Sequence, residues 1–323
     1  MKLLMCVYLI LSTAVLTAGD GYFISIGNGA HRMYSKDGVK WEAHEFAGKP
    51  GHDQNDLKAI ARGNGVTVVV GGFFKSNIFL TKDGKTWETV NFNIGVLSGV
   101  IFENGKFYIF NEGGNTAESK DGKKWKKLSG AVVSQWAKEE AKKLGLDNLK
   151  SNIRMWKFAN DTFVGAGDNG VICATKNFKD FHMQKAPGDV KRFRLASGNG
   201  VFVAADNNGG KYAFVSKDGK DWTDISPKIS DKEKIRDIVF DGERFIMKIQ
   251  DYGLESKDGK TWKKIKNATF PGTLIVTEKA YFSAGPWYKY TDKPKISFDK
   301  GKTWKDCQFP AQSAMRYVLY IEK

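Results

Sequence analysis

Ser256-Lys257-Asp258-Gly259-Lys260-Thr261-Trp262 is a stretch that this chain of 323 residues repeats along its length. Four more copies of that length end at Trp41, Trp87, Trp125 and Trp222, a longer copy spans residues 297–304, and a degenerate copy spans residues 175–181. Asp-Gly between two apolar runs predicts a tight hairpin turn, because glycine accepts a positive φ and the aspartate side chain caps the turn. Seven copies, most of them about 40 residues apart, indicate a repeat protein.

Each repeat has the pattern of four short strands. In the fifth unit, apolar runs predict strands at 191–196, 201–205, 212–215 and 222–225, and Ser197-Gly198-Asn199-Gly200 predicts the first turn. Four antiparallel strands in a unit of about 40–45 residues form the blade of a β-propeller. We therefore expect an all-β fold, a single seven-bladed β-propeller over residues 19–323.

The two ends of the repeat region complement each other. The first unit starts at 21–26 with the pattern of a second strand, whereas residues 314–320 have the pattern of a first strand. We expect this C-terminal strand to become the inner strand of the first blade, which closes the ring and removes free sheet edges. A short amphipathic helix is expected at about 131–144, and a long aromatic loop at 285–294.

The N-terminal segment has the pattern of a targeting signal. Lys2 precedes an apolar run at 3–16, and small residues follow at Ala18 and Gly19. This pattern predicts a signal peptide over residues 1–18, with a membrane anchor as the alternative. No later apolar run approaches the ~20 residues of a membrane span, so we expect a secreted or periplasmic monomer without a transmembrane segment after cleavage.

The composition is basic, with a formal net charge of +15 carried mainly by lysine, and many of these lysines fall in the repeated turns. This charge indicates either a solvated rim or adhesion to an acidic surface, and no motif for specific nucleic-acid binding is present. Cys173 and Cys307 fall in blades four and seven, too far apart for the ~7 Å limit of a disulfide. The four histidines have no metal-ligand spacing, so no metal or cofactor is expected.

The repeated stretch resembles the Asp-box, or BNR repeat, of sialidase-like β-propellers. The copy at 297–304 fits the family spacing Ser-x-Asp-x-Gly-x-Thr-Trp, while the other strong copies lack one residue between Asp and Gly. In that family the box is a structural turn away from the ligand site, and the superfamily includes sialidases, other glycosidases, sorting receptors and photosystem assembly factors. The chain lacks the Arg-Ile-Pro motif of sialidases and has seven boxes, whereas sialidases have six blades.

Basic residues recur where the innermost strands begin. Aligning the units on their first turn places Lys58, Arg154 and Arg236 in equivalent positions, with Arg192, Arg194 and Arg316 within a residue or two. First strands line the channel, so these side chains are expected to gather at one mouth. The arginine fork suits a carboxylate or phosphate, which predicts an anion site there. The alternative is that Asp237 and nearby loop carboxylates neutralise these cations.

The aromatic loop is expected on the same face as this mouth. Trp287 and Tyr288 in that loop suit stacking on sugar rings or packing against a protein partner, or they plug the mouth. We therefore expect a binding or assembly module for an acidic glycan or an acidic protein partner.

The alternative is a glycan-active hydrolase, which needs two facing carboxylates. Several carboxylates are expected on this face without an evident pair, namely Asp53, Asp56, Glu112, Asp168, Asp206 and Asp251. The sequence therefore does not exclude a catalytic activity, but it favours a binding protein over an enzyme.

Overall fold

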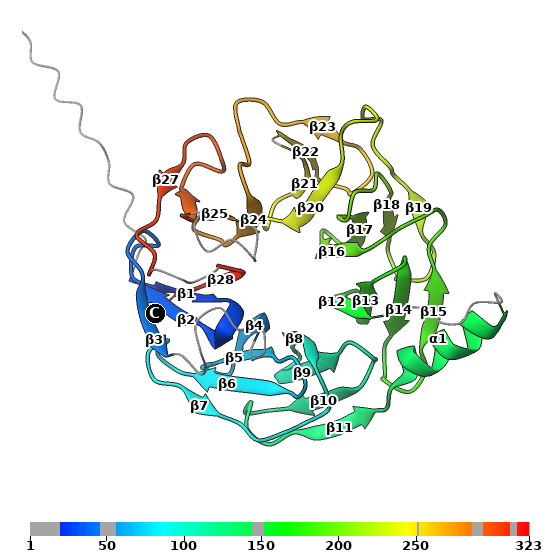
Figure 1. Cartoon of the computed structure of the whole chain (residues 1–323), viewed down its shortest axis with the longest axis horizontal. Helices are drawn as coiled ribbons and strands as arrows, with labels where there is room; N and C mark the ends of the chain where they lie inside the picture. Colours follow the sequence, from blue (N-terminus) through cyan, green and yellow to red (C-terminus); the bar gives the residue numbers. More distant parts are fainter. Residues whose placement is uncertain are drawn as a thin grey trace, which may run out of the picture.

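Seven four-stranded antiparallel sheets stand in a ring around a central channel (Figure 1). The computed structural model describes residues 20–45, 56–143, 152–250, 252–285, 293–310 and 315–322. The architecture confirms the predicted seven-bladed β-propeller. The predicted signal peptide at 1–18, and Trp287 and Tyr288 of the aromatic loop, lie outside the described residues. Within the described ranges no helix is long and apolar enough to span a membrane.

The strands follow one order in every blade, from the channel outward. Blade one contains β28 (Tyr317–Ile321), β1 (Tyr22–Ile26), β2 (Arg32–Ser35) and β3 (Glu42–Glu45), with a short 3-10 helix, η1 (Asn28–Ala30), between β1 and β2. Blade two contains β4 (Leu57–Gly63), β5 (Val66–Gly71), β6 (Asn77–Thr81) and β7 (Glu88–Thr89). Blade three contains β8 (Leu97–Glu103), β9 (Lys106–Asn111), β10 (Thr116–Ser119) and β11 (Lys126–Ser129).

The remaining four blades repeat this order. Blade four contains β12 (Ile153–Ala159), β13 (Thr162–Gly167), β14 (Val171–Thr175) and β15 (His182–Lys185). Blade five contains β16 (Phe193–Gly198), β17 (Val201–Asp206), β18 (Ala213–Ser216) and β19 (Thr223–Asp224). Blade six contains β20 (Ile235–Phe240), β21 (Phe245–Ile249), β22 (Tyr252–Ser256) and β23 (Lys263–Lys264). Blade seven contains β24 (Thr273–Val276), β25 (Tyr281–Ala284), β26 (Lys295–Ser297) and β27 (Lys305–Asp306).

The C-terminal strand closes the ring as predicted. β28 pairs antiparallel with β1, with Phe23 opposite Tyr320 and Ile26 opposite Tyr317. Because residues from both ends of the chain share blade one, that sheet forms only in the complete ring. The helix α1 (Val132–Lys143) follows blade three, and its Val133 packs in the apolar cluster between blades three and four at the outer side of the ring (Figure 1).

The repeated turn is held by its own side chains. In the fifth copy the Gly219 amide donates to Ser216 Oγ at 2.8 Å, and the Lys220 amide donates to Asp218 Oδ1 at 2.8 Å. Gly219 has φ +74°, which a residue with a Cβ rarely adopts. Trp222 Nε1 then donates to the Gly219 carbonyl at 3.0 Å. The turn thus orients the tryptophan toward the neighbouring blade.

Seven apolar clusters lie between successive blades. Trp125 of blade three packs in a cluster with Val68 and Leu80 of blade two, and the other copies follow the same rule. Trp87 is buried as expected, whereas Trp125, Trp222 and Trp262 are half-buried. Each motif tryptophan therefore belongs to the core between two blades rather than within its own sheet.

A second link between blades involves the first turn of several units. Asn64, Asn160 and Asn199 each have a positive φ, and each side-chain amide donates to two carbonyls of the next blade. Asn199 Nδ2 bonds Glu243 O at 3.1 Å and Lys257 O at 2.9 Å. We call these contacts the asparagine stitches. They join adjacent blades on the face opposite the starts of the first strands.

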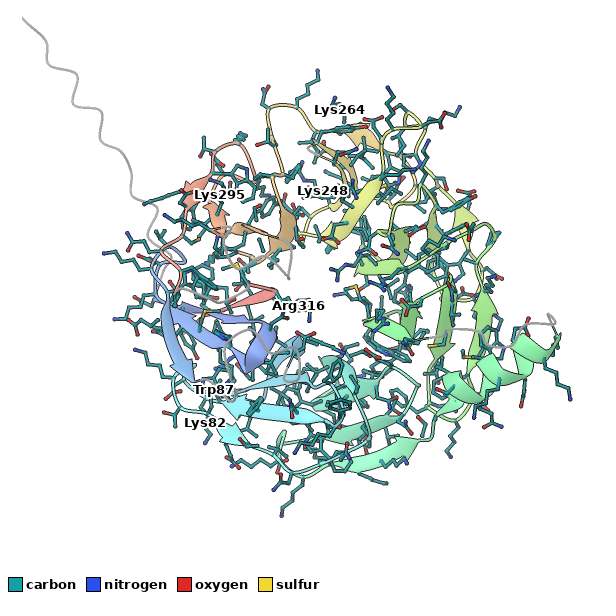
Figure 2. All side chains as sticks on the ribbon, viewed as in Figure 1. Lys82, Trp87, Lys248, Lys264, Lys295 and Arg316 are labelled. Atoms are coloured by element: carbon teal, nitrogen blue, oxygen red, sulfur yellow. The ribbon has the colours of Figure 1, made fainter. Side chains whose placement is uncertain are left out.

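Many lysines lie around the outside of the ring, both in a repeated turn (Lys82) and in the outer strands (Lys264 and Lys295). Figure 2 shows Lys82, Lys264 and Lys295 toward the outer rim, whereas Arg316 points into the centre. Cys173 and Cys307 are separate buried thiols, as expected from their places in different blades. The basic side chains inside the channel are thus a distinct group from the rim lysines.

Candidate anion site at the channel mouth

A cavity of about 870 Å³ opens where the first strands begin, and residues of all seven blades line it. Seven cationic side chains face it, namely Lys58, Arg154, Arg192, Arg194, Arg236, Lys248 and Arg316. Three carboxylates line the same cavity, those of Asp56, Glu112 and Asp237. Asp168, which bonds two of the arginines, adds a fourth carboxylate. The cavity therefore holds an excess of three positive charges.

A β-bulge places the equivalent residues of several blades. The pairing of the first strand shifts around Lys58 in blade two, Arg154 in blade four and Arg236 in blade six, and around Ser98 in blade three. A bulge leaves one residue without a partner and redirects its side chain. Each of these residues lines the cavity. The positional equivalence inferred from the sequence thus has a structural cause.

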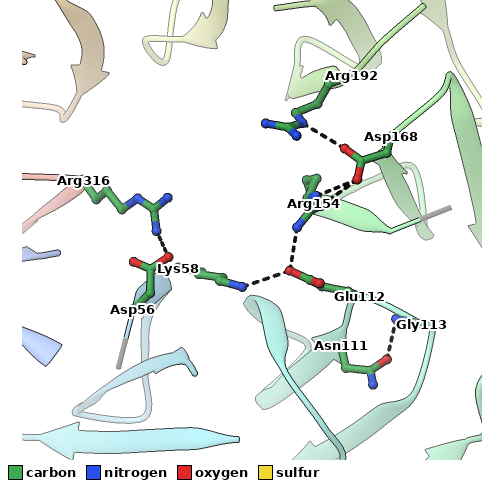
Figure 3. A network of polar contacts seen from close by, with 9 residues as sticks. All are labelled: Asp56, Lys58, Asn111, Glu112, Gly113, Arg154, Asp168, Arg192 and Arg316. Carbon is green, nitrogen blue, oxygen red and sulfur yellow. Dashed lines mark hydrogen bonds and ion pairs between the residues drawn. The ribbon is translucent and has the colours of Figure 1, made fainter. Parts of the chain in front are cut away.

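Four of the blades are joined by a chain of ion pairs (Figure 3). Lys58 Nζ donates to Glu112 Oε1 at 2.9 Å, and Arg154 Nη1 donates to the same oxygen at 2.8 Å. Arg154 Nη2 donates to Asp168 Oδ2 at 2.6 Å, and Arg192 Nε donates to Asp168 Oδ1 at 2.8 Å. Cations and carboxylates alternate along this chain, so most of its charge is neutralised internally.

The ion pairs keep both partners charged. Burial acts against the charge of Arg154, but the bonds to Asp168 and the charge of Glu112 outweigh burial and raise the arginine pKa. Burial likewise acts against the Asp168 carboxylate, but the hydrogen bonds from Arg154 and Arg192 outweigh it and lower its pKa. Arg316 forms a further ion pair with Asp56 across the junction of blades one and two.

A second group lies among blades four, five and six. Arg194 Nε is 3.7 Å from Asp237 Oδ1, and Asp237 lies opposite Lys248 in the register of β20 and β21. Burial raises the pKa of the Asp237 carboxyl, with the charge of Arg194 acting against it. Burial, followed by repulsion from Arg194, lowers the pKa of Lys157. These groups share one carboxylate among several cations.

Two arginines keep unused donors toward the cavity. The Arg192 side chain is 46% exposed. Among the described residues its guanidinium donates only through Nε, to Asp168, so both terminal nitrogens remain available. Arg236 is exposed and makes no ion pair or side-chain hydrogen bond to any residue that the structure describes. They come from adjacent blades five and six. The predicted cations are therefore not equivalent, because some are committed to carboxylates and these two are not.

The carboxylates expected for a hydrolase are largely committed. Asp56, Glu112 and Asp168 form ion pairs, and the fully buried Asp206 accepts backbone amides of Arg192 and Asn208. Asp53 and Asp251 lie outside the described residues. A glycosidase acid needs a raised pKa, which is opposite to the direction at Asp168.

Sequence reasoning missed three residues of this region. Lys157 and Lys248 lie in β12 and β21, and Phe73 lines the cavity from the loop after β5. A charged residue inside a predicted inner strand, as Lys157 is, was the available signal. Among the described residues, no group of three His, Cys, Asp or Glu side chains lies close enough to hold a metal ion.

Comparison with solved structures places the chain among known propellers. No protein-family model matches the chain, and no curated protein matches it. It is similar to the structure of YCF48 bound to D1 peptide, with 14% identity over 81% of this chain and 85% of that one, at a TM-score of 0.59. YCF48 from Cyanidioschyzon merolae gives 13% identity over 81% and 87% at a TM-score of 0.59.

A further neighbour with this fold is a lyase. Selenomethionine-substituted virginiamycin B lyase from Staphylococcus aureus gives 13% identity over 81% of this chain and 91% of that one, at a TM-score of 0.53. Proteins this distant in sequence share the fold alone, and both neighbours are seven-bladed β-propellers. The likeness therefore shows the fold of this chain, and its function depends on its own side chains.

Proposed function

We propose that the protein is a binding or assembly module that takes an anionic ligand, an acidic glycan or an acidic protein partner, at the channel mouth. The observation that carries the proposal is the pair Arg192 and Arg236, whose guanidinium donors face a cavity with an excess of positive charge. Like charges gathered in one cavity repel, and an anion relieves that repulsion. Bidentate bonds from an arginine fork favour a carboxylate or a phosphate.

The remaining cations have a supporting role in this proposal. Lys58, Arg154, Arg194 and Arg316 hold the carboxylates of the mouth in place and keep its potential positive. The aromatic loop adds contacts through Trp287 and Tyr288. Gly285, the first residue of that loop, lines the cavity, which supports this proposal.

We also propose that the repeated turns are Asp-boxes of the sialidase-like type and that residues 1–18 are a signal peptide of a secreted or periplasmic protein. The first proposal is supported by the Ser, Asp and Trp hydrogen bonds that recur in the copies ending at Trp41, Trp125 and Trp222. The second is supported by the sequence pattern alone. A peptide bound to YCF48, a protein of similar fold, is compatible with a polypeptide ligand.

The proposal is tested by anion binding to a charge-depleted variant. The probes are fluorescein-labelled oligo-aspartate and oligogalacturonate. Their binding to the protein is measured by fluorescence anisotropy at two salt concentrations. Arg192→Gln with Arg236→Gln should weaken binding by about 100-fold, because two charge-assisted contacts contribute roughly 3 kcal/mol together. The matched control is Lys217→Gln with Lys257→Gln, which removes two charges from exposed turns on the opposite face. Equal loss in both variants would contradict a localised site.

The hydrolase alternative needs two facing carboxylates, and Asp237 is the cavity carboxyl whose pKa is raised by burial. A raised pKa is what a general acid needs. Turnover of 4-methylumbelliferyl glycosides that Asp237→Asn abolishes would support the hydrolase. Binding of acidic probes without turnover would support the binding module.

A further inference from the structure

Two neighbouring phenylalanines are exposed beside the cationic mouth. Phe73 is 50% exposed and Phe74 is 79% exposed, and among the described residues no other large hydrophobic side chain is classed as exposed. Their rings contact edge to face, with centroids 4.6 Å apart and planes at 87°. Single exposed apolar residues are common on protein surfaces, but an adjacent pair next to a cavity is typical of an interaction site.

The loop that carries this pair is fixed at both ends. The Gly72 amide donates to the Asp56 carbonyl at 2.8 Å, and Gly72 has φ +119°. At the other end Ser76 Oγ donates to the Gly95 carbonyl at 2.7 Å and accepts from the Ile94 amide at 3.0 Å. The backbone that carries the two rings is therefore anchored on both sides, which lowers the entropic cost of ordering the loop on binding.

Phe73 of the aromatic pair and the available arginines, Arg192 and Arg236, line one cavity. The loop belongs to blade two, which lies across the ring from blades five and six (Figure 1). Asp56 links the loop to the cations of the mouth, because its carbonyl anchors the loop while its carboxylate pairs with Arg316. A ligand that uses both sides must span the mouth.

We propose that the ligand is a polypeptide segment that places acidic side chains on Arg192 and Arg236 and an apolar side chain on Phe73 and Phe74. This inference rests on the proposed function and names its ligand class. Phenylalanine has no hydrogen-bonding group, so these rings favour a ligand with apolar surface. An extended peptide advances about 3.3 Å per residue and can present acidic and apolar side chains at both ends of the span. An acidic glycan presents hydroxyl and carboxylate groups along its whole length.

The test separates the apolar contact from the anionic one. The probes are fluorescein-labelled peptides with an Asp/Glu cluster and a Leu-Phe pair at varied separation, the same peptides with Ser-Ser in place of Leu-Phe, and oligogalacturonate. At least one Leu-Phe peptide should bind the full protein about 10-fold more tightly than its Ser-Ser partner. Phe73→Ser with Phe74→Ser should remove that advantage while leaving the Ser-Ser peptide unaffected. Phe73→Leu with Phe74→Leu retains apolar surface and should keep most of the affinity advantage of the Leu-Phe peptide.

The outcomes distinguish this inference from the function on which it rests. Oligogalacturonate that binds through Arg236, with no peptide preference for Leu-Phe, would overturn the polypeptide ligand and leave the anion site standing. A Leu-Phe advantage that survives Phe73→Ser with Phe74→Ser would also overturn it. Failure of every acidic probe, with the fold intact by thermal melting, would overturn both. Loss of the advantage in the Ser variant alone, with normal melting, supports the proposal.

Discussion

Arg154 and Arg236 occupy equivalent bulges, yet replacing each with glutamine should affect a different property of the protein. Arg154 donates three hydrogen bonds to Glu112 and Asp168, whereas Arg236 has none to the described residues. Arg154→Gln leaves two carboxylates with fewer cations. Arg236→Gln removes a charge that is already surplus in the cavity. We therefore expect Arg154→Gln to affect stability and Arg236→Gln to affect ligand binding.

The size of the stability loss follows from burial. The side chains of Glu112 and Asp168 are 19% and 10% exposed. Breaking a fully buried ion pair costs about 3–5 kcal/mol. The partial exposure of Arg154 and the contacts that Lys58 and Arg192 retain reduce this, so we expect a loss of about 2 kcal/mol in the free energy of unfolding. Arg236→Gln should change it by less than about 0.5 kcal/mol, as is usual for an exposed side chain.

The loss should also depend on pH. Arg154 and Arg192 hold the Asp168 pKa below its usual range. The carboxylate therefore stabilises the folded state above its unfolded pKa of about 3.9, and that contribution disappears as pH falls through the lower folded pKa. The difference between wild type and Arg154→Gln should be complete at neutral pH and shrink in strong acid.

Urea unfolding at neutral pH and in acid, followed by tryptophan fluorescence, measures both variants. Arg236→Gln serves as the matched control, because it removes the same charge from the equivalent position of another blade. Equal stability of Arg154→Gln and wild type at neutral pH would refute the view that the ion-pair chain is structural. Equal destabilisation by the two variants would refute the distinction between committed and available arginines.

Further predictions concern the ring itself. Asn199→Asp removes both donors of one asparagine stitch and should lower the free energy of unfolding, measured by urea denaturation, by about 2 kcal/mol. An unchanged urea midpoint would show that the stitch does not contribute to stability. Trp125→Ala should cost about 2–3 kcal/mol by the same assay, less than a fully buried tryptophan, because this side chain is half-buried; no loss would speak against inter-blade packing. Deleting residues 317–323 should give aggregated protein by gel filtration, since β1 loses its partner, and a soluble product with native melting would disprove closure. Burial raises the pKa of Cys307 to about 12 and also raises the pKa of Cys173. In protein lacking residues 1–18, a thiol reagent should therefore react with both cysteines only after denaturation. Rapid labelling of the folded protein would contradict their burial.

The architecture was predictable because its signals are local. Ser216, Asp218 and Gly219 complete their turn within four residues, so the same letters give the same hairpin wherever they recur. Counting those turns gives the number of blades, and the unpaired strand pattern at each end gives the closure by β28. Aligning the repeats was also enough to find Lys58, Arg154 and Arg236 as equivalent residues.

The contacts of the site were not predictable in the same way, because each depends on a partner from a distant part of the chain. Glu112 meets Lys58 from 54 positions earlier, and Asp56 meets Arg316 from 260 positions later. The bulge that redirects Arg236 depends on strand pairing, which the sequence pattern does not register.

The sequence by itself therefore determined the seven-bladed ring, its closure and the presence of cations at one mouth, since turn chemistry and repeat spacing act over short distances. Only the tertiary structure decided that Arg154 is bound between two carboxylates while Arg192 and Arg236 keep donors available. Only the tertiary structure also placed Phe73 on the same cavity, across the mouth from Arg192 and Arg236. The physical reason is that charge neutralisation and exposure are set by which blades meet at the channel, and that is a property of the closed ring.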